Sequence, residues 1–162
     1  MMLTAQQISD QIEIAQLLNR YFRAIDTKDW DLLDEVFTPD ARLHYTTPGE
    51  IETTYATMKP IFATFTATFA FMQHSPSQMV IEVDGDAATS GNNLRAIHVQ
   101  ETHDGEQNTW VVYGTYSDTL TRTPEGWRIS ERVFLGAHTE GELLPSDRVK
   151  SFPLPRHLQT GS

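Results

Sequence analysis

The chain has 162 residues, of which 39% are hydrophobic and 21% charged, and this composition fits one globular domain and excludes a disordered chain. Twelve basic and twenty-two acidic residues give a net charge of −10 without a Lys/Arg cluster, so neither nucleic acid nor an anionic membrane is an expected partner. The absence of cysteine excludes disulfides, thiolate catalysis and thiolate-bound metal.

The sequence contains neither a targeting signal nor a membrane-spanning pattern. Residues 1–10 lack the basic start and apolar run of a signal peptide. The longest stretch without Asp, Glu, Lys or Arg, residues 60–81, is rich in Thr, Ser and Gln and does not resemble a membrane span. We therefore expect a cytoplasmic protein.

The first part of the chain is predicted to be mostly helical. Thr4 and Gln7 form a capping-box pattern at the start of a helix over residues 5–25. A break at residues 27–29 leads to a short helix over residues 30–36, followed by a short strand over residues 41–45. Phenylalanines at helical spacing after Pro60 favour a further helix over residues 53–68.

One apolar stripe on the first helix ends in a carboxylate. Asp26 continues, at helical spacing, a series expected to face the core, which consists of Ile8, Ile12, Ala15, Leu18 and Phe22. A carboxylate in such a place needs a partner cation, a hydrogen-bonded imidazole or a pocket. The alternative is that Asp26 only caps the helix end or faces water beside Lys28, and the sequence leaves both readings open.

From residue 73 onward the hydrophobic period changes to two, which is typical of strands. Long strands are predicted over residues 73–83, 87–102, 107–122 and 127–138. The turns between them contain Asp-Gly or Pro-Glu-Gly, which indicates consecutive antiparallel hairpins. We expect the domain to span residues 1–140, followed by an irregular tail over residues 141–162.

Helices that precede a meander of long strands predict an α+β domain. The N-terminal helices are expected to pack on one face of a strongly curved antiparallel sheet. Such a sheet, wrapped around a long helix, forms a cone whose open end is a pocket.

Six histidines are the candidates for chemistry. His74 begins the first long strand and His98 lies between Ile97 and Val99, so each is either a hydrogen-bonded core residue or a pocket residue. Three others are in less suitable positions: His44 on an outer strand face, His103 in a turn and His157 in the tail. The position of His138, near the end of the last strand, leaves its role open.

Metal and cofactor motifs are absent from the sequence. His98 and His103 are separated by an odd number of residues and so face opposite sides of a strand, and there is no His-Glu-x-x-His motif. Neither a Gly-x-Ser-x-Gly elbow nor a phosphate-binding glycine loop occurs. We therefore expect no metal, no cofactor and no nucleophilic serine.

General acid–base chemistry remains. A carboxylate that holds a neutral imidazole sets its tautomer and stabilises the imidazolium that forms when it takes a proton. Asp26 at the end of the helix and His74 at the start of the strand are the best-placed pair, although their spacing alone does not show that they touch.

Several short motifs resemble one known family. The chain resembles the SnoaL-like branch of the NTF2-like (ketosteroid isomerase-like) superfamily, and its pattern is closest to the scytalone dehydratase-like group. That group also contains bile-acid dehydratases and a hexachlorocyclohexane dehydrochlorinase. The matching segments lie between residues 5 and 138: Ile25-Asp26-x-x-Asp29-Trp30-Asp31, Leu43-His44-Tyr45, Gln73-His74, Asn93-Leu94-Arg95-Ala96-Ile97-His98, Tyr116-Ser117-Asp118-Thr119-Leu120 and Glu125-Gly126-Trp127-Arg128.

The resemblance implies a catalytic set in this chain. It pairs Asp26 with His74, makes His98 a second pocket histidine, and makes Tyr45 the residue that polarises or protonates a substrate oxygen. Tyr21, five residues before the aspartate, matches a tyrosine of the bile-acid enzymes.

The resemblance also implies substrate contacts on the third long strand. Ser117 matches a serine of the scytalone enzyme. Thr119 stands where that enzyme has an asparagine, and this departure concerns the substrate rather than the fold.

The expected function is that of a cofactor-independent lyase of the dehydratase type. Its substrate would be a small, apolar, cyclic or polyketide-like hydroxy-carbonyl compound. The alternatives are an isomerase or cyclase that uses the same pair, or a non-catalytic domain that binds a small ligand. Exposed sheet faces commonly pair in this fold, so we also expect a homo-oligomer, either a dimer or a trimer.

Overall fold

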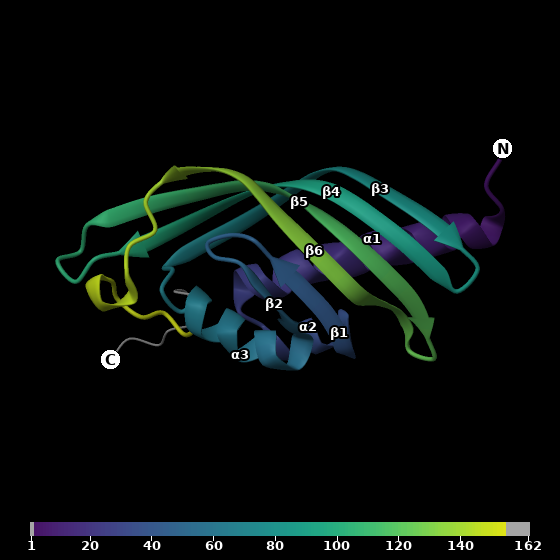
Figure 1. The fold of residues 1–162 in the computed structure, drawn as a ribbon, viewed down its shortest axis with the longest axis horizontal. Coiled ribbons are helices and arrows are strands. Elements are labelled where there is room, and N and C mark those ends of the chain that lie inside the picture. Colours follow the sequence, from purple (N-terminus) through teal and green to yellow (C-terminus); the bar gives the residue numbers. More distant parts are fainter. Residues whose placement is uncertain (1, 155–162) are drawn as a thin grey trace.

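The computed structural model describes residues 2–154 and contains three helices, six strands and a 3₁₀ turn in that range (Figure 1). The helices are α1 (Ala5–Thr27), α2 (Trp30–Asp34) and α3 (Tyr55–Thr66), and the turn is η1 (Ser146–Arg148). The strands are β1 (Phe37–Tyr45), β2 (Ile51–Thr54), β3 (Phe71–Asp84), β4 (Ala87–Glu101), β5 (Gln107–Thr123) and β6 (Gly126–Gly141). No helix among these residues is long and apolar enough to span a bilayer.

The strands form one mixed sheet in the order β2-β1-β6-β5-β4-β3. The predicted hairpins β3–β4, β4–β5 and β5–β6 are confirmed. The expected α+β arrangement of N-terminal helices on a sheet is confirmed, but the sheet is mixed and not antiparallel throughout, because β1 pairs with β6 in parallel, with Tyr45 opposite Phe134. Hairpin turns predict only neighbours in sequence, whereas β1 covers an edge of β6 that would otherwise expose unpaired backbone groups. The four-residue strand β2 was not predicted, since it is too short to show an alternating pattern.

Helix α1 lies across the concave side of the arched strands β3–β6 (Figure 1). Its start is the predicted capping box between Thr4 and Gln7. The expected stripe is wrong in its first half, because Ile8 and Ile12 are 47% and 54% exposed. The helix instead turns the adjacent face, with Asp10 and Ile14, toward the sheet. Nearer its end the stripe holds, since Leu18 and Phe22 are buried.

The break after α1 is a left-handed turn at Lys28, whose φ is 55°. The backbone N–H of Lys28 donates to the carbonyls of Ala24 and Ile25, which closes the helix. Asp29 then accepts a hydrogen bond from the N–H of Leu32 and caps α2. This turn determines where the last helical side chains, Asp26 among them, lie relative to the sheet.

Residues 142–154, which we call the C-terminal strap, are irregular apart from η1 and a β-bridge between Val149 and Thr102, but they pack against the domain (Figure 1). The buried side chain of Gln100 donates to the carbonyl of Leu144 at 3.0 Å and accepts from its N–H at 2.8 Å. Farther along, the N–H of Phe152 donates to the carbonyl of Ala67 at 2.6 Å. The predicted tail also includes residues 155–162, which lie outside the described residues.

Candidate active site

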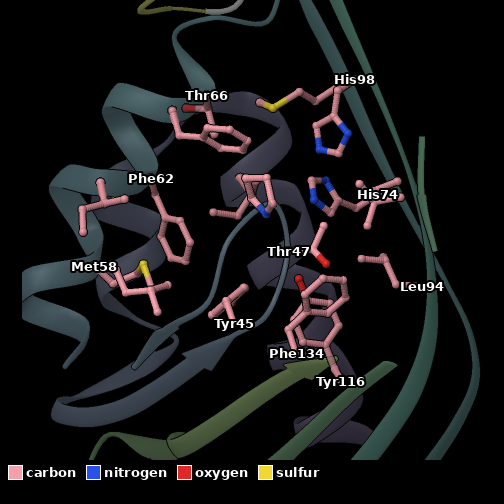
Figure 2. A pocket seen from close by; sticks show the side chains of 18 of the residues that line it. Tyr45, Thr47, Met58, Phe62, Thr66, His74, Leu94, His98, Tyr116 and Phe134 are labelled. Atoms are coloured by element: carbon pink, nitrogen blue, oxygen red, sulfur yellow. The ribbon is translucent and has the colours of Figure 1, made fainter. Parts of the chain in front are cut away.

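A cavity of about 250 Å³ lies between α3 and the concave side of the sheet. Figure 2 shows His74 and His98 along one side, Met58 and Phe62 of α3 opposite them, and Tyr45 and Tyr116 at the lower end. None of the described side chains that line it is Asp, Glu, Lys or Arg. The few polar side chains come from His, Tyr, Thr and Trp, and apolar walls surround them: Ile25, Met58, Ile61, Phe62, Phe65, Met72, Leu94, Val112 and Phe134 are among the lining residues.

Asp26 and His74 form a close pair beside this cavity. Asp26 Oδ1 lies 2.6 Å from His74 Nδ1, and Asp26 Oδ2 accepts from the backbone N–H of His74 at 3.0 Å. Both carboxylate oxygens of Asp26 thus contact His74 of β3. The side chain of Asp26 is only 22% exposed and that of His74 only 8%. Because a carboxylate accepts, Nδ1 carries the proton of the neutral ring and Nε2 keeps a free lone pair. The structure brings together the pair that the sequence suggested, and it does not leave Asp26 as a mere helix cap.

His98 lies beside His74, with a ring-centroid separation of 5.6 Å. Its Nδ1 lies 3.3 Å from the carbonyl oxygen of Trp110, and the ring contacts those of Phe69 and Trp110. Burial, together with the neighbouring His74, lowers the pKa of His98 to about 3. His98 is therefore both a buried, hydrogen-bonded residue and a cavity residue, and it remains neutral near pH 7.

Three tyrosine hydroxyls meet at the other end of the cavity. The Tyr21 hydroxyl lies 3.0 Å from that of Tyr45 and 3.3 Å from that of Tyr116. Burial raises the pKa of Tyr45 and of Tyr116 well above the usual value, so both remain protonated. Two hydrogen bonds among three hydroxyls use at most two of their three protons. One O–H of this cluster is thus left to donate to a bound molecule.

A buried ion pair supports the tyrosines from behind. Arg132 Nε and Nη2 lie 2.6 and 2.7 Å from the carboxylate oxygens of Asp118, and both side chains are 0% exposed. The guanidinium carbon lies 4.0 Å from the ring centre of Tyr21 and 4.3 Å from that of Tyr116. Its Nη1 has no hydrogen-bond partner among the described residues. This positive charge partly offsets the effect of burial on the pKa of Tyr45 and Tyr116.

The loop before β2 closes one edge of the cavity. Thr47 lines the cavity, and Thr46 Oγ1 accepts from the N–H of Gly136 on β6 at 2.9 Å. A Cβ on Gly136 would lie 1.8 Å from Thr47 Oγ1, so only glycine lets the loop approach this closely.

Ser117 and Thr119 do not reach the cavity. Both are exposed on the opposite face of β5, since they alternate with Tyr116 and Asp118, which point inward. The predicted role of these two residues in substrate binding therefore disagrees with the structure. The physical reason is the period of two in a strand: a residue adjacent to a cavity residue faces away from it.

The sequence reasoning missed Tyr116 and the pair Arg132–Asp118. Parity along β5 could have identified Tyr116, because Trp110 and Val112 are separated from it by even numbers and also line the cavity. No local signal could have identified Arg132. The β5–β6 register shifts between the pairs Thr119–Glu131 and Leu120–Ile129, just before Arg132 along β6. The partner of Arg132, Asp118, lies on another strand.

The other described histidines lie away from the cavity. His44 contacts Glu50 on the surface, His103 contacts the carbonyl of Asp147, and exposed His138 lies beside Tyr113. His157 lies outside the described residues. Within residues 2–154, no group of three His, Asp or Glu side chains is arranged to hold a metal ion.

Comparisons with known proteins agree with this architecture. The profile described as a SnoaL-like domain matches residues 6–133. An uncharacterized protein of Mycobacterium tuberculosis is 38% identical over 134 residues, which cover 82% of this chain and 88% of that protein.

Solved structures with low sequence identity share the fold. A Novosphingobium aromaticivorans protein, provisionally named a scytalone dehydratase, has a TM-score of 0.75 at 18% identity. The match covers 99% of this chain and 100% of that protein's chain. A hexachlorocyclohexane dehydrochlorinase has a TM-score of 0.69 at 11% identity, and the match covers 84% of this chain and 90% of that protein's chain. This fold, the NTF2-like fold, thus includes dehydratases and dehydrochlorinases. From the profile match and the Mycobacterium relative, the chain belongs to the SnoaL-like domain family.

Proposed function

We propose that this protein is a cofactor-independent lyase of the dehydratase type, acting on a small, uncharged, cyclic hydroxy-ketone. The observation that carries the proposal is the 2.6 Å contact between Asp26 Oδ1 and His74 Nδ1. It leaves His74 Nε2 as a base beside a cavity without charged side chains. A pure scaffold has no need of such a pair.

The proposed reaction begins with proton abstraction. His74 Nε2 removes a proton from the carbon next to the substrate carbonyl, and Asp26 stabilises the resulting imidazolium. The carbonyl oxygen becomes an enolate oxygen, which accepts the free O–H of the cluster formed by Tyr21, Tyr45 and Tyr116. The buried Arg132 favours negative charge at this end of the cavity.

The second step breaks the carbon–oxygen bond. The electron pair of the enolate forms a carbon–carbon double bond, and the hydroxyl on the adjacent carbon departs. The imidazolium of His74 returns its proton to the departing oxygen, so water leaves and the base is regenerated. Atoms and charges balance without a cofactor.

Two structural neighbours support an elimination. The names of the hexachlorocyclohexane dehydrochlorinase and of the provisionally assigned scytalone dehydratase both denote the loss of a small molecule across two carbons. Their identities of 18% and 11% carry the fold only, so the chemistry assigned to this chain rests on the geometry of Asp26 and His74.

The test is a panel of cyclic β-hydroxy-ketones that begins with 3-hydroxy-1-tetralone, whose dehydration gives fluorescent 1-naphthol. We expect His74→Ala and Asp26→Asn to reduce the rate by on the order of 10²–10⁴-fold, the usual contribution of a positioned base. The matched control is His103→Ala, which removes an exposed histidine and should leave the rate unchanged.

The products distinguish elimination from its alternatives. Equal rates of water loss in the wild type and all three variants would refute the proposal. If a proton moves between carbons without loss of water, and this exchange depends on His74, the same pair serves an isomerase. A cyclised product that depends on His74 would indicate a cyclase.

A further inference from the structure

His98 differs from His74 in which ring nitrogen remains free and in what surrounds the ring. Its Nδ1 lies 3.3 Å from the carbonyl oxygen of Trp110. A carbonyl oxygen can only accept, so Nδ1 carries the ring proton and Nε2 carries only a lone pair. The rings of Phe69 and Trp110, with centroids 4.8 and 4.9 Å away, hold this orientation.

The surroundings also keep His98 from gaining a second proton. It is 6% exposed, and burial between aromatic rings lowers its pKa to about 3, with a further contribution from His74. The neighbouring titratable groups of the described residues are His74 of β3, Asp26 behind it, and Lys28, which donates to the carbonyl of Phe69. The side chains packed on the ring itself, Phe69 and Trp110, are apolar or neutral. At neutral pH, His98 therefore neither donates from Nε2 nor acts as a general acid.

We infer that His98 is a specificity-determining residue that selects substrates with a hydroxyl donor next to the carbon that His74 deprotonates. The inference rests on the proposed function, because it concerns the same cavity. The two rings are neighbours in the lining of one cavity, with centroids 5.6 Å apart, so a small molecule bound there can contact both. A single substrate hydroxyl can thus donate to His98 Nε2 while its oxygen faces the imidazolium of His74.

In this assignment, His98 positions the substrate and transfers no proton. The departing oxygen receives its proton from His74, as in the reaction above, and His98 stays neutral throughout. His98 orients the hydroxyl before the bond breaks. A substrate in which that hydroxyl is methylated or replaced by a carbonyl offers no donor and leaves His98 Nε2 without a partner, which costs affinity.

The first test reads the protonation of His98 directly. Nitrogen-15 NMR of the histidine rings should show a protonated Nδ1 and a lone pair on Nε2 for His98 from about pH 5 to about pH 9. Titration of the His98 ring within this range, or a proton on Nε2, would overturn the inference. This measurement uses the wild type alone and needs no substrate.

The second test compares two unreactive ligands, 2-tetralol and 2-methoxytetralin, which have no carbonyl and cannot undergo the elimination. The wild type should bind the alcohol about 3–10-fold more tightly than the ether, as expected for one net hydrogen bond. His98→Phe, which keeps a ring without an acceptor, should abolish this ratio, and His98→Gln, which keeps an acceptor, should restore part of it. An unchanged ratio in His98→Phe would refute the inference.

The outcomes separate the two proposals. If the alcohol preference depends on His98 but no cyclic hydroxy-ketone loses water, the proposed function fails and the selection by His98 stands. If water loss depends on His74 but the alcohol preference does not depend on His98, the proposed function stands and the selection by His98 fails. Should His98→Phe not fold, the tautomer measured in the wild type decides.

Discussion

Arg132 and Asp118 place two opposite charges in the core, where isolated charges are very costly. Their two short contacts satisfy the carboxylate, and the faces of Tyr21 and Tyr116 lie against the guanidinium. Such pairs contribute little net stability, because desolvation offsets the attraction between them. Their position behind the tyrosines agrees with a role in positioning the hydroxyls and holding positive charge near them.

Removing one partner of this ion pair should reduce the free energy of unfolding far more than removing both partners. Arg132→Met leaves the Asp118 carboxylate buried without its cation, so we expect a loss of about 3–5 kcal/mol in the free energy of unfolding. The double variant Arg132→Met/Asp118→Leu removes both charges and should recover most of that loss. Urea unfolding of the three proteins measures both values. A double variant as unstable as the single one would show that the pair stabilises the fold outright.

At the scale of elements, the C-terminal strap joins parts of the chain that are distant in sequence. Lys28 at the end of α1 donates through Nζ to the carbonyls of Phe69 and Phe152, at 2.9 and 2.5 Å. Lys28 therefore ties α1 to the segment that precedes β3 and to the strap. Since Phe69 also packs against His98, the strap supports the wall of the cavity without lining it.

The buried ammonium of Lys28 should make stability depend on pH. Burial lowers the pKa of Lys28 to about 8, against 10.5 for an exposed lysine. Between these values the unfolded chain binds more protons than the folded chain, so the stability contributed at this site rises with pH and is lowest below pH 8.

Lys28→Met should remove this dependence. From about pH 7.5 to about pH 9.5, we expect the free energy of unfolding of the wild type to gain about 1–2 kcal/mol relative to that of the variant. Urea unfolding at the two pH values tests this. Parallel pH dependences in the two proteins would contradict it.

At the scale of the whole molecule, charge is separated from the cavity. The chain carries a net charge of −10, yet no charged side chain of the described residues lines the cavity. Behind the lining, Asp26, Asp118 and Arg132 bring two negative charges and one positive charge near the site. An anionic ligand would therefore lose its hydration without gaining a cation to pair with.

The cavity should accordingly prefer neutral ligands. We expect 1-naphthol to bind at least about tenfold more tightly than 1-naphthoate, which has a similar ring and a carboxylate, because the burial of an unpaired charge costs more than 1.4 kcal/mol. Quenching of tryptophan fluorescence, to which cavity residue Trp110 contributes, can measure both affinities. Equal affinities would mean that Arg132 or another cation becomes available to the ligand.

The sequence by itself determined the class of fold and most of its elements. The capping box, the break at residues 27–29 and the hairpin turns are local signals, because they depend on side chains a few residues apart. Asp26 and His74 stood out for the same local reason: each is a polar residue in a pattern that predicts burial. The family resemblance then suggested that the two belong together.

Only the tertiary structure decided which of these residues share a cavity. The parallel pairing of β1 with β6, the meeting of Tyr21, Tyr45 and Tyr116, and the pairing of Arg132 with Asp118 all join residues from different elements. Strand parity excluded Ser117 and Thr119, which the motif had included. Which face of a strand points inward, and which ring nitrogen of His98 is free, depend on packing across the whole chain, and a local pattern carries no information about either.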